Sequence, residues 1–453
     1  MRHLIIENAY IVPVTGPEIP SGHVVVAGDR IAAVGAGPAP EEYTPEAERF
    51  DANGCLVTPG FVNTHHHLYQ WASQGVAADG TLFAWLVASY PTWAAMDADV
   101  VKGAATAGLA WLALSGCTTS TDHHYIFPKG RGDLFAAEIE AARDVGVRFH
   151  PARGSMDRGE SQGGLPPDGV VESIDRILDH TSEVIDAYHD PSYSSMLRVA
   201  VAPCSPFSVS ADLMTASAEL ARAKGVRLHT HLAETLDEEE HCAEQFGMTP
   251  AQYLERSGWL GDDVWLAHCV HLHDEDIARF AASRTGTAHC PSSNARLGAG
   301  VARVSELHRA GAPVGLGVDG AASAELTPLA GEVRMAMLMQ RARYGPAALT
   351  AREALAMATI GGAACLGREA EIGSLEAGKL ADVAVWRLDG FHAAIDDPVV
   401  AFAYGQTPPL ALLLTGGNTV VAGGELRTVP HDTAARAGAE AHRRLTALAA
   451  DDL

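Results

Sequence analysis

The chain has 453 residues, 19% charged and 47% hydrophobic, which is enough for a large core plus an accessory domain and argues against disorder. Its net charge of -24, without a basic stripe, argues against nucleic-acid binding. Seven scattered cysteines without a Cys-x-x-Cys pair favour a reducing, cytoplasmic compartment. The N-terminus lacks the apolar core of a signal peptide, and no run of about 18 apolar residues predicts a membrane span.

Both ends of the chain are rich in short β-type runs that Gly and Pro separate. These runs predict strands at residues 4–14, 23–26, 30–35, 381–386, 410–415 and 418–422. We expect residues 1–57 and 367–430 to pair into one small β-sandwich domain, with a C-terminal surface helix in residues 431–453.

Residues 58–366 alternate short apolar runs with longer amphipathic ones. The predicted strands are 56–67, 117–122, 147–151, 197–203, 226–231, 264–268, 287–291 and 314–319. Strands that alternate with helices in this way predict an α/β fold, a (β/α)8 TIM barrel, with a doubly wound open sheet as the alternative. Two long insertions, residues 71–98 and 153–195, follow the first and third strands and are expected on the catalytic face.

Side chains that bind metals stand at the ends of four predicted strands. Alternation along the first strand places His65 and His67 on one face and turns His66 away. Because the active sites of such barrels lie at the C-terminal strand ends, these four ends together predict one metal site. The residues are His65 and His67 on the first strand, His229 and His231 on the fifth, His268 on the sixth and Asp319 on the eighth.

These motifs resemble the amidohydrolase superfamily, in particular its branch of mononuclear deaminases and chlorohydrolases that act on purines, pyrimidines and s-triazines. The resemblance runs from residues 59–67 to residues 378–382 and includes His-Cys-Pro-Ser-Ser-Asn-Ala-Arg-Leu-Gly at 289–298. It implies one divalent metal ion, zinc by default and Fe²⁺ as the alternative. The implied ligands are His65, His67, His231 and Asp319, and the implied catalytic residues are Glu234, His268 and Asp319.

The chemistry of these side chains suits a hydrolysis. Three imidazoles and one carboxylate leave a metal ion with an open position for water, whose pKa falls to about 7. We expect Asp319 to accept a proton from that water and Glu234 to carry a proton to a ring nitrogen of the substrate. His268 is expected to orient the attacking oxygen.

Within the branch, residues 63–70 are most similar to 8-oxoguanine deaminases. Cys204 stands where adenosine-type members carry His, which favours a free base and makes Cys204 a pocket-wall residue. Gln70 is expected to pair with the ring, Trp93 to stack on it, and Arg153, at the head of a loop, to hold a carbonyl oxygen. The alternatives are solvation of a helix terminus for Gln70, packing for Trp93 and a surface ion pair for Arg153.

The expected reaction is therefore hydrolytic deamination of 8-oxoguanine to urate and ammonia, with isocytosine and guanine-like bases as related substrates. Hydrolysis of an s-triazine, with loss of chloride or an amine, is the nearest alternative. A catalytically inactive barrel that serves as an assembly module is the alternative from another class. We expect a small-molecule substrate and self-association of the chain into a homo-oligomer.

Overall fold

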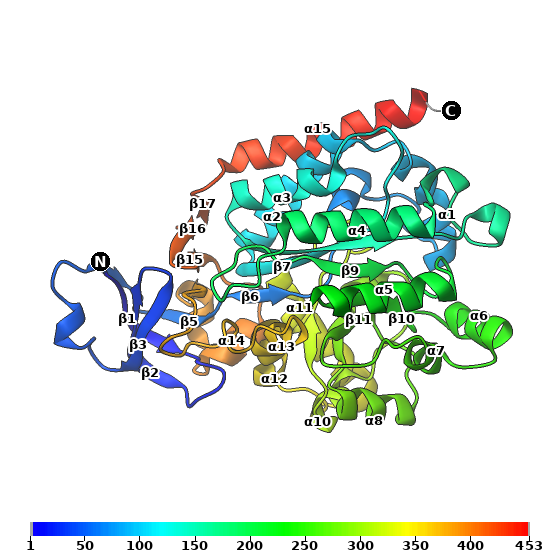
Figure 1. The fold of residues 1–453 in the computed structure, drawn as a ribbon. Helices are drawn as coiled ribbons and strands as arrows, with labels where there is room; N and C mark the ends of the chain where they lie inside the picture. Colours follow the sequence, from blue (N-terminus) through cyan, green and yellow to red (C-terminus); the bar gives the residue numbers. More distant parts are fainter. Residues whose placement is uncertain (1–2, 452–453) are drawn as a thin grey trace.

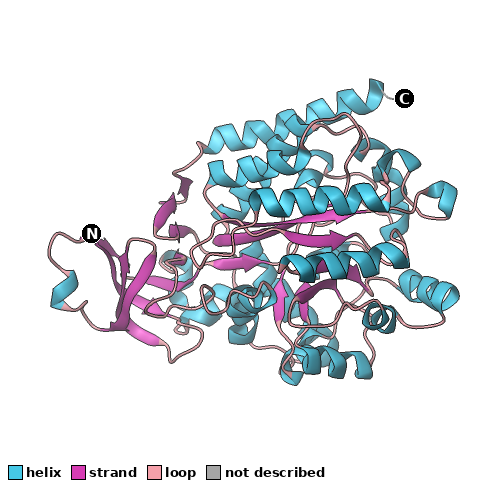
Figure 2. Cartoon of the chain, in the orientation of Figure 1, coloured by secondary structure: helices cyan, strands magenta, loops and turns pink. Residues whose placement is uncertain are grey.

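Eight parallel strands close into a barrel at the centre of the molecule, and helices surround it (Figures 1 and 2). This computed structural model describes residues 3–451. Every barrel strand is buried, because side chains fill its interior and helices cover its outer face. The strands are β6 (Phe61–Asn63), β7 (Cys117–His124), β8 (Arg148–Ser155), β9 (Ala200–Pro203), β10 (Leu228–Leu232), β11 (Val264–His268), β12 (Gly286–His289) and β13 (Val314–Leu316).

Helices connect the barrel strands, and local signals set their ends. The α5 helix begins where the Ser210 side chain accepts a hydrogen bond from the Leu213 N–H, and it ends at Gly225 in the left-handed conformation. The barrel helices are α1 (Leu82–Trp93), α2 (Ala98–Leu114), α3 (Leu134–Val145), α4 (Ile174–Tyr188), α5 (Ala211–Lys224), α6 (Leu236–Phe246), α7 (Pro250–Arg256), α8 (Asp274–Ser283), α9 (Pro291–Arg296), α10 (Val304–Ala310), α11 (Leu329–Tyr344), α12 (Ala351–Ala356) and α13 (Gly362–Cys365).

The C-terminal helix α15 (His431–Asp451) lies along α2 on the outside of the barrel (Figure 1). A Cβ on Gly103 would lie 2.8 Å from the Ala437 carbonyl oxygen, so this glycine lets the two helix backbones approach closely. Among residues 3–451, no helix combines the length and hydropathy that a membrane span requires.

The two chain ends form one mixed sheet beside the barrel, on the left in Figure 1. Its order is β17-β16-β15-β14-β5-β1-β2-β3, with β4 also paired to β1. The strands are β1 (His3–Ile11), β2 (Ile19–Ala27), β3 (Arg30–Ala36), β4 (Glu48–Asp51), β5 (Cys55–Pro59), β14 (Val383–Arg387), β15 (Leu410–Thr415), β16 (Asn418–Ala422) and β17 (Glu425–Leu426), and α14 (Pro398–Tyr404) lies between β14 and β15. The prediction of a barrel with an accessory β-domain from both chain ends is confirmed, whereas the boundaries after residues 57, 366 and 430 stay predictions.

The prediction of one continuous strand over residues 56–67 was wrong, because this stretch contains parts of two strands. β5 pairs with β14 in the accessory sheet, whereas β6 pairs with β7 and β13 in the barrel. Gly60 lies between them, where a Cβ would come within 2.3 Å of the Thr118 side chain. His65–His67 therefore lie in the segment that follows β6 and not in a strand, so strand alternation does not explain their orientation.

Candidate metal centre and active site

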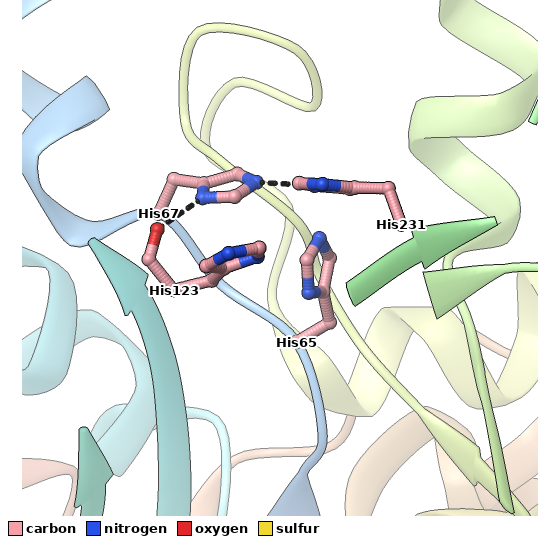
Figure 3. Close-up of side chains that lie close together, drawn as sticks. All are labelled: His65, His67, His123 and His231. Carbon is pink, nitrogen blue, oxygen red and sulfur yellow. Dashed lines mark hydrogen bonds between the residues drawn. The ribbon is translucent and has the colours of Figure 1, made fainter. Parts of the chain in front are cut away.

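Four histidines gather at the C-terminal ends of the barrel strands, as Figure 3 shows. His65 and His67 come from the segment after β6, His123 from the end of β7 and His231 from β10. One ring nitrogen of each lies within 4.8 Å of those of the others, and all four side chains are buried. Asp319 follows β13 and closes the group. Its Oδ1 lies 3.3 Å from Nε2 of both His65 and His67.

Hydrogen bonds to the backbone fix which nitrogen of two imidazoles carries the proton. Nδ1 of His67 donates to the carbonyl oxygen of His123 at 2.7 Å, and Nδ1 of His231 donates to that of Cys204 at 2.6 Å. Each ring therefore presents its Nε2 lone pair to the centre of the cluster. Those two Nε2 atoms are 3.1 Å apart.

His229 controls His65 in the same way through one further ring. Nδ1 of His229 donates to the Trp265 carbonyl at 2.8 Å, which leaves its Nε2 as an acceptor. Nδ1 of His65 donates to that Nε2 at 2.8 Å, so His65 also turns an Nε2 lone pair to the cluster. Burial lowers the pKa of His229 to about 3, which keeps this connecting ring neutral.

The lone pairs that face one another fit a bound cation. Nε2 of His65 and Oδ1 of Asp319 are buried without a hydrogen-bond partner in the described part of the chain. Buried acceptors in such contact are costly unless a positive charge lies between them. Three imidazoles and one carboxylate form a donor set of zinc or another divalent transition metal, so these residues fit the metal that the sequence predicts.

Asp319 is held as an anion. Its Oδ2 accepts hydrogen bonds from Ser293 at 2.5 Å and Ser323 at 2.9 Å. Burial opposes ionisation, but His65 and the nearby His268 hold the pKa of Asp319 well below its usual range.

His123 is a member of the cluster that sequence reasoning missed. Its Nε2 donates to the Ala202 carbonyl at 2.7 Å, and its Nδ1 has no partner among residues 3–451. Its ring stacks on His231, with ring centroids 4.8 Å apart. The available signal was its place at the end of the second barrel strand, beside strand ends that already carried histidines.

Glu234 and His268 lie next to the four-histidine cluster and supply acid–base groups. Oε2 of Glu234 is 3.7 Å from Nε2 of His268, and its Oε1 is unpartnered within the described chain. Burial raises the pKa of Glu234 to about 7, so its protonated form is populated near neutral pH. Nδ1 of His268 donates to Asn294 Oδ1 at 2.9 Å; burial lowers its pKa, but Glu234 and Asp319 raise it more.

The backbone is strained where these side chains are held. Ala233, His268 and Asp319 have φ angles of 49°, 70° and 64°. Each such conformation costs a non-glycine residue about 1–3 kcal/mol and persists only where the surrounding structure enforces it. The strain coincides with the three strand ends that carry Glu234, His268 and Asp319.

A cavity of about 30 Å³ lies above the cluster, room for about one water molecule. Helix α1 covers it with apolar and aromatic side chains, and polar groups face it from the barrel. The lining residues are His67, Gln70, Leu82, Trp85, Leu86, Tyr90, Tyr125, Cys204, Phe207, His231, Glu234, His268, Leu297 and Asp319. Both amide atoms of Gln70 are buried and unpartnered within residues 3–451, so Gln70 offers a donor and an acceptor there.

The structure does not bring two predicted substrate contacts to this cavity. Trp93 is fully buried, and its Nε1 donates to Ser73 Oγ at 2.9 Å; Trp85, from the same helix, lines the cavity instead. Arg153 lies within β8 and not in a loop, and its guanidinium pairs with Glu172 at 2.7 Å. Cys204 does line the cavity, and burial raises its pKa to about 12, so its thiol stays neutral.

Comparisons with known proteins point to one family. The model of the Amidohydrolase family matches residues 56–424. The 8-oxoguanine deaminase of Pseudomonas aeruginosa is 43% identical and covers 91% of each chain, and an isoxanthopterin deaminase of an unknown prokaryotic organism is 37% identical over 89% of this chain and 87% of its own. The crystal structure of atrazine chlorohydrolase from Arthrobacter aurescens, complexed with zinc, has a TM-score of 0.91 and 34% identity over 98% of this chain and 100% of its own.

Proposed function

The chain belongs to the amidohydrolase family, and on that premise we propose that it is a metal-dependent deaminase that converts 8-oxoguanine and water to urate and ammonia. One observation carries the choice of a planar heterocycle: the unpartnered amide of Gln70 faces the same cavity as Glu234 and Asp319. An edge with adjacent N–H and carbonyl groups would satisfy both amide atoms. The deaminase relative at 43% identity supports this substrate.

The proposed metal ligands are His65, His67, His231 and Asp319. A divalent ion bound there would activate a water molecule as the nucleophile. Asp319 would take a proton from the attacking water through Oδ1, since Ser293 and Ser323 already donate hydrogen bonds to its Oδ2. Protonated His268 would orient the attacking oxygen by a hydrogen bond from Nε2, while Asn294 accepts the hydrogen bond from Nδ1. Burial lowers the pKa of His268, but Glu234 and Asp319 raise it more.

Glu234 carries the proton that makes the substrate reactive. Its pKa of about 7 lets it hold a proton near neutral pH and deliver that proton to the ring nitrogen beside the amino-bearing carbon. Protonation makes this carbon electrophilic, and the oxygen of water adds to it. The proton that Asp319 took from the water passes to the amine, and the C–N bond breaks to release ammonia. The hydroxyl proton returns to Glu234 as the new carbonyl forms. The buried setting keeps bulk water from competing for these protons.

A second candidate is hydrolysis of an s-triazine, which the likeness to atrazine chlorohydrolase favours. The same groups would protonate a triazine ring nitrogen and displace chloride or an amine. Isoxanthopterin is a further substrate to test, because a relative that is 37% identical to this chain is named an isoxanthopterin deaminase.

The test measures ammonia and chloride release from a panel of 8-oxoguanine, guanine, isocytosine, isoxanthopterin and atrazine, with metal content determined on the same sample. We expect the highest kcat/KM for 8-oxoguanine and about one metal ion per chain. A higher kcat/KM for another panel member would reassign the substrate. Release of chloride from atrazine without deamination of any base would favour the triazine activity.

A further inference from the structure

A second cavity lies at the opposite end of the barrel from the histidines, where the strands begin. It measures about 200 Å³ and lies between the start of β9, the segment before β10 and the turn at Gly367. Its wall includes His150, Arg198 and Arg227. Pro191 and Gly225 at its rim are exposed, so the cavity opens to solvent. Nothing in the proposed deamination uses this end of the molecule.

Arginines gather around this cavity. Four arginines surround His150; burial and then these arginines push the pKa of His150 well below its usual range, so the ring is neutral. Two carboxylates contact the arginines: Asp382 pairs with Arg148 at 2.9 Å, and Glu371 pairs with Arg198 at 2.8 Å and also with Arg368. Two further carboxylates lie near, that of Asp190 beside Arg198 and that of Asp262 beside Arg227, so the charge around the cavity is close to balanced.

Arg227 differs from the other three arginines. Within the described residues it makes no ion pair, and its guanidinium donates to the carbonyls of Asp262 and Cys365 at 2.5 and 2.8 Å. The carboxylates of Asp262, Asp263 and Glu369 lie near it, and the last two pair with other arginines, Arg222 and Arg284. A guanidinium stays charged at any physiological pH, so Arg227 keeps its charge.

Two of these arginines also have unused hydrogen-bond donors. The Nε atoms of Arg198 and Arg227 are buried and have no acceptor in residues 3–451, and both residues line the cavity. The chain is also shaped around one guanidinium, since a Cβ on Gly367 would lie 2.4 Å from Nη1 of Arg227. Charged donors without an acceptor are costly in a protein interior, and arginine forks match the oxygens of phosphate and carboxylate.

We propose that this cavity binds a multivalent oxyanion of the phosphate type, held by Arg198 and Arg227 against the wall that His150 forms. The volume is below that of cavities that take drug-sized ligands, about 300–1,000 Å³, so the anion is a free phosphate or the phosphate group of a monoester whose remainder stays outside.

The test follows thermal unfolding of the metal-loaded protein in sodium phosphate and, at equal ionic strength, in sodium chloride. We expect Tm to rise with the logarithm of the phosphate concentration and not with chloride, because a ligand at free concentration c that binds the folded state stabilises it by RT ln(1 + c/Kd). Ribose 5-phosphate is tested in parallel, and a lower Kd than that of phosphate identifies a monoester. Equilibrium dialysis should count about one phosphate per chain at this site.

The variants Arg198→Gln and Arg227→Gln should bind phosphate at least tenfold more weakly. Arg222→Gln, which removes an exposed neighbour on α5, should bind as the wild type does. If Arg227→Gln does not fold, Arg198→Gln carries the test. An equal response to chloride and phosphate, or undiminished binding in the Arg198 variant, would overturn the proposal. Binding of phosphate at the metal centre can be told apart from binding at this cavity, because phosphate at the metal centre would inhibit deamination competitively in every variant.

Discussion

At the scale of single residues, the site depends on a hydrogen bond behind each imidazole. His67 and His231 use backbone carbonyls, whereas His65 uses the ring of His229. The acceptor behind His65 is the His229 ring and not a backbone carbonyl. The orientation of the His65 Nε2 lone pair therefore depends on a side chain, which a substitution can remove. His229 is therefore a positioning residue, distinct from the proposed ligands.

We expect His229→Phe to weaken metal retention by about 10–100-fold, the usual cost of losing a partner that orients a metal ligand. The variant keeps a ring of similar volume but removes the acceptor for Nδ1 of His65. Competition with a chelator on the purified protein measures the effect. His229→Gln, which restores an acceptor oxygen, should retain more metal than His229→Phe; equal losses would argue for a packing role alone.

Glu234→Gln should reduce kcat by about 10²–10⁴-fold, the range for loss of a general acid–base group. The amide keeps the size and burial of the side chain but cannot carry a proton to the substrate. Metal content should be unchanged, since Glu234 is not among the proposed ligands. Near-normal turnover by a fully metal-loaded variant would refute the proton-carrying role.

A pH effect arises at Glu138, which lies behind the active-site segment and contacts His124 and Asp122. Burial raises its pKa to about 8 from an ordinary value near 4.5. The folded state therefore holds a proton that the unfolded state releases, and the free energy of unfolding falls as the pH rises from about 4.5 to about 8.

Glu138→Gln should reduce this fall, because its neutral amide has no proton to lose. Denaturant unfolding at pH 5.5, 7.0 and 8.5 measures the slope. Glu140→Gln, on the same helix α3 but exposed, should keep the wild-type slope. A slope in Glu138→Gln as steep as that of the wild type would contradict the assignment.

At the scale of elements, α1 controls entry to the active-site cavity. The cavity of about 30 Å³ is too small for a purine, and four side chains of α1 line it. We therefore expect the helix to move before a substrate binds, as covering elements often belong to the less stable parts of a protein.

Trp85→Ala should let a chelator remove the metal several-fold faster than from the wild type, because the side chain forms part of the cavity wall. The measurement is the rate of metal loss under excess chelator. Val87→Ala changes the exposed face of the same helix and should leave the rate unchanged. Equal rates in the two variants would show that α1 does not limit access.

Much of the fold was predictable from local patterns, and its exceptions have non-local causes. The apolar run before His65 reads as one strand because the transfer from one sheet to the other at Gly60 is set by pairing with β14, far along the chain. Arg153 was expected in a loop because β8 continues as Pro-Ala-Arg-Gly-Ser beyond its apolar run. Trp93 and Trp85 share a helix, and only packing decides which of them faces the cavity.

The site was more predictable than its surroundings because its donors occupy strand ends, which a barrel necessarily brings together. The proposed ligands His65, His67, His231 and Asp319 were named from that rule and the family resemblance. The roles of His123 and His229 needed atomic hydrogen bonds, which no spacing in the sequence reveals.

At the scale of the whole molecule, a buried ion pair fastens the accessory sheet to the barrel. Arg148 at the start of β8 pairs with Asp382, just before β14, and both side chains are 1% exposed. Asp382 also accepts from the Gly416 N–H. The motif at residues 378–382 therefore stabilises the contact between sheet and barrel through Asp382, at the barrel end opposite the metal centre.

Arg148→Met should lower the free energy of unfolding by about 3–5 kcal/mol, because it leaves the Asp382 carboxylate buried without its partner. Lys102→Met removes an exposed pair with Glu140 and should cost at most about 1 kcal/mol. Denaturant unfolding of both variants measures the difference. A loss of less than 1 kcal/mol for Arg148→Met would show that water or neighbouring groups already stabilise Asp382.

The join at Gly60 also sets an order of events while the chain is being synthesised. His65 and His67 leave the ribosome early, but Thr58, just before them, receives its hydrogen bond from Trp386, 328 residues later. The Gly60 N–H likewise donates to the Asp382 carbonyl. A nascent chain thus displays the two histidines long before their anchor exists. We expect selective metal loading only after translation has delivered β14, so the metal that is bound reflects the ions available to the completed chain.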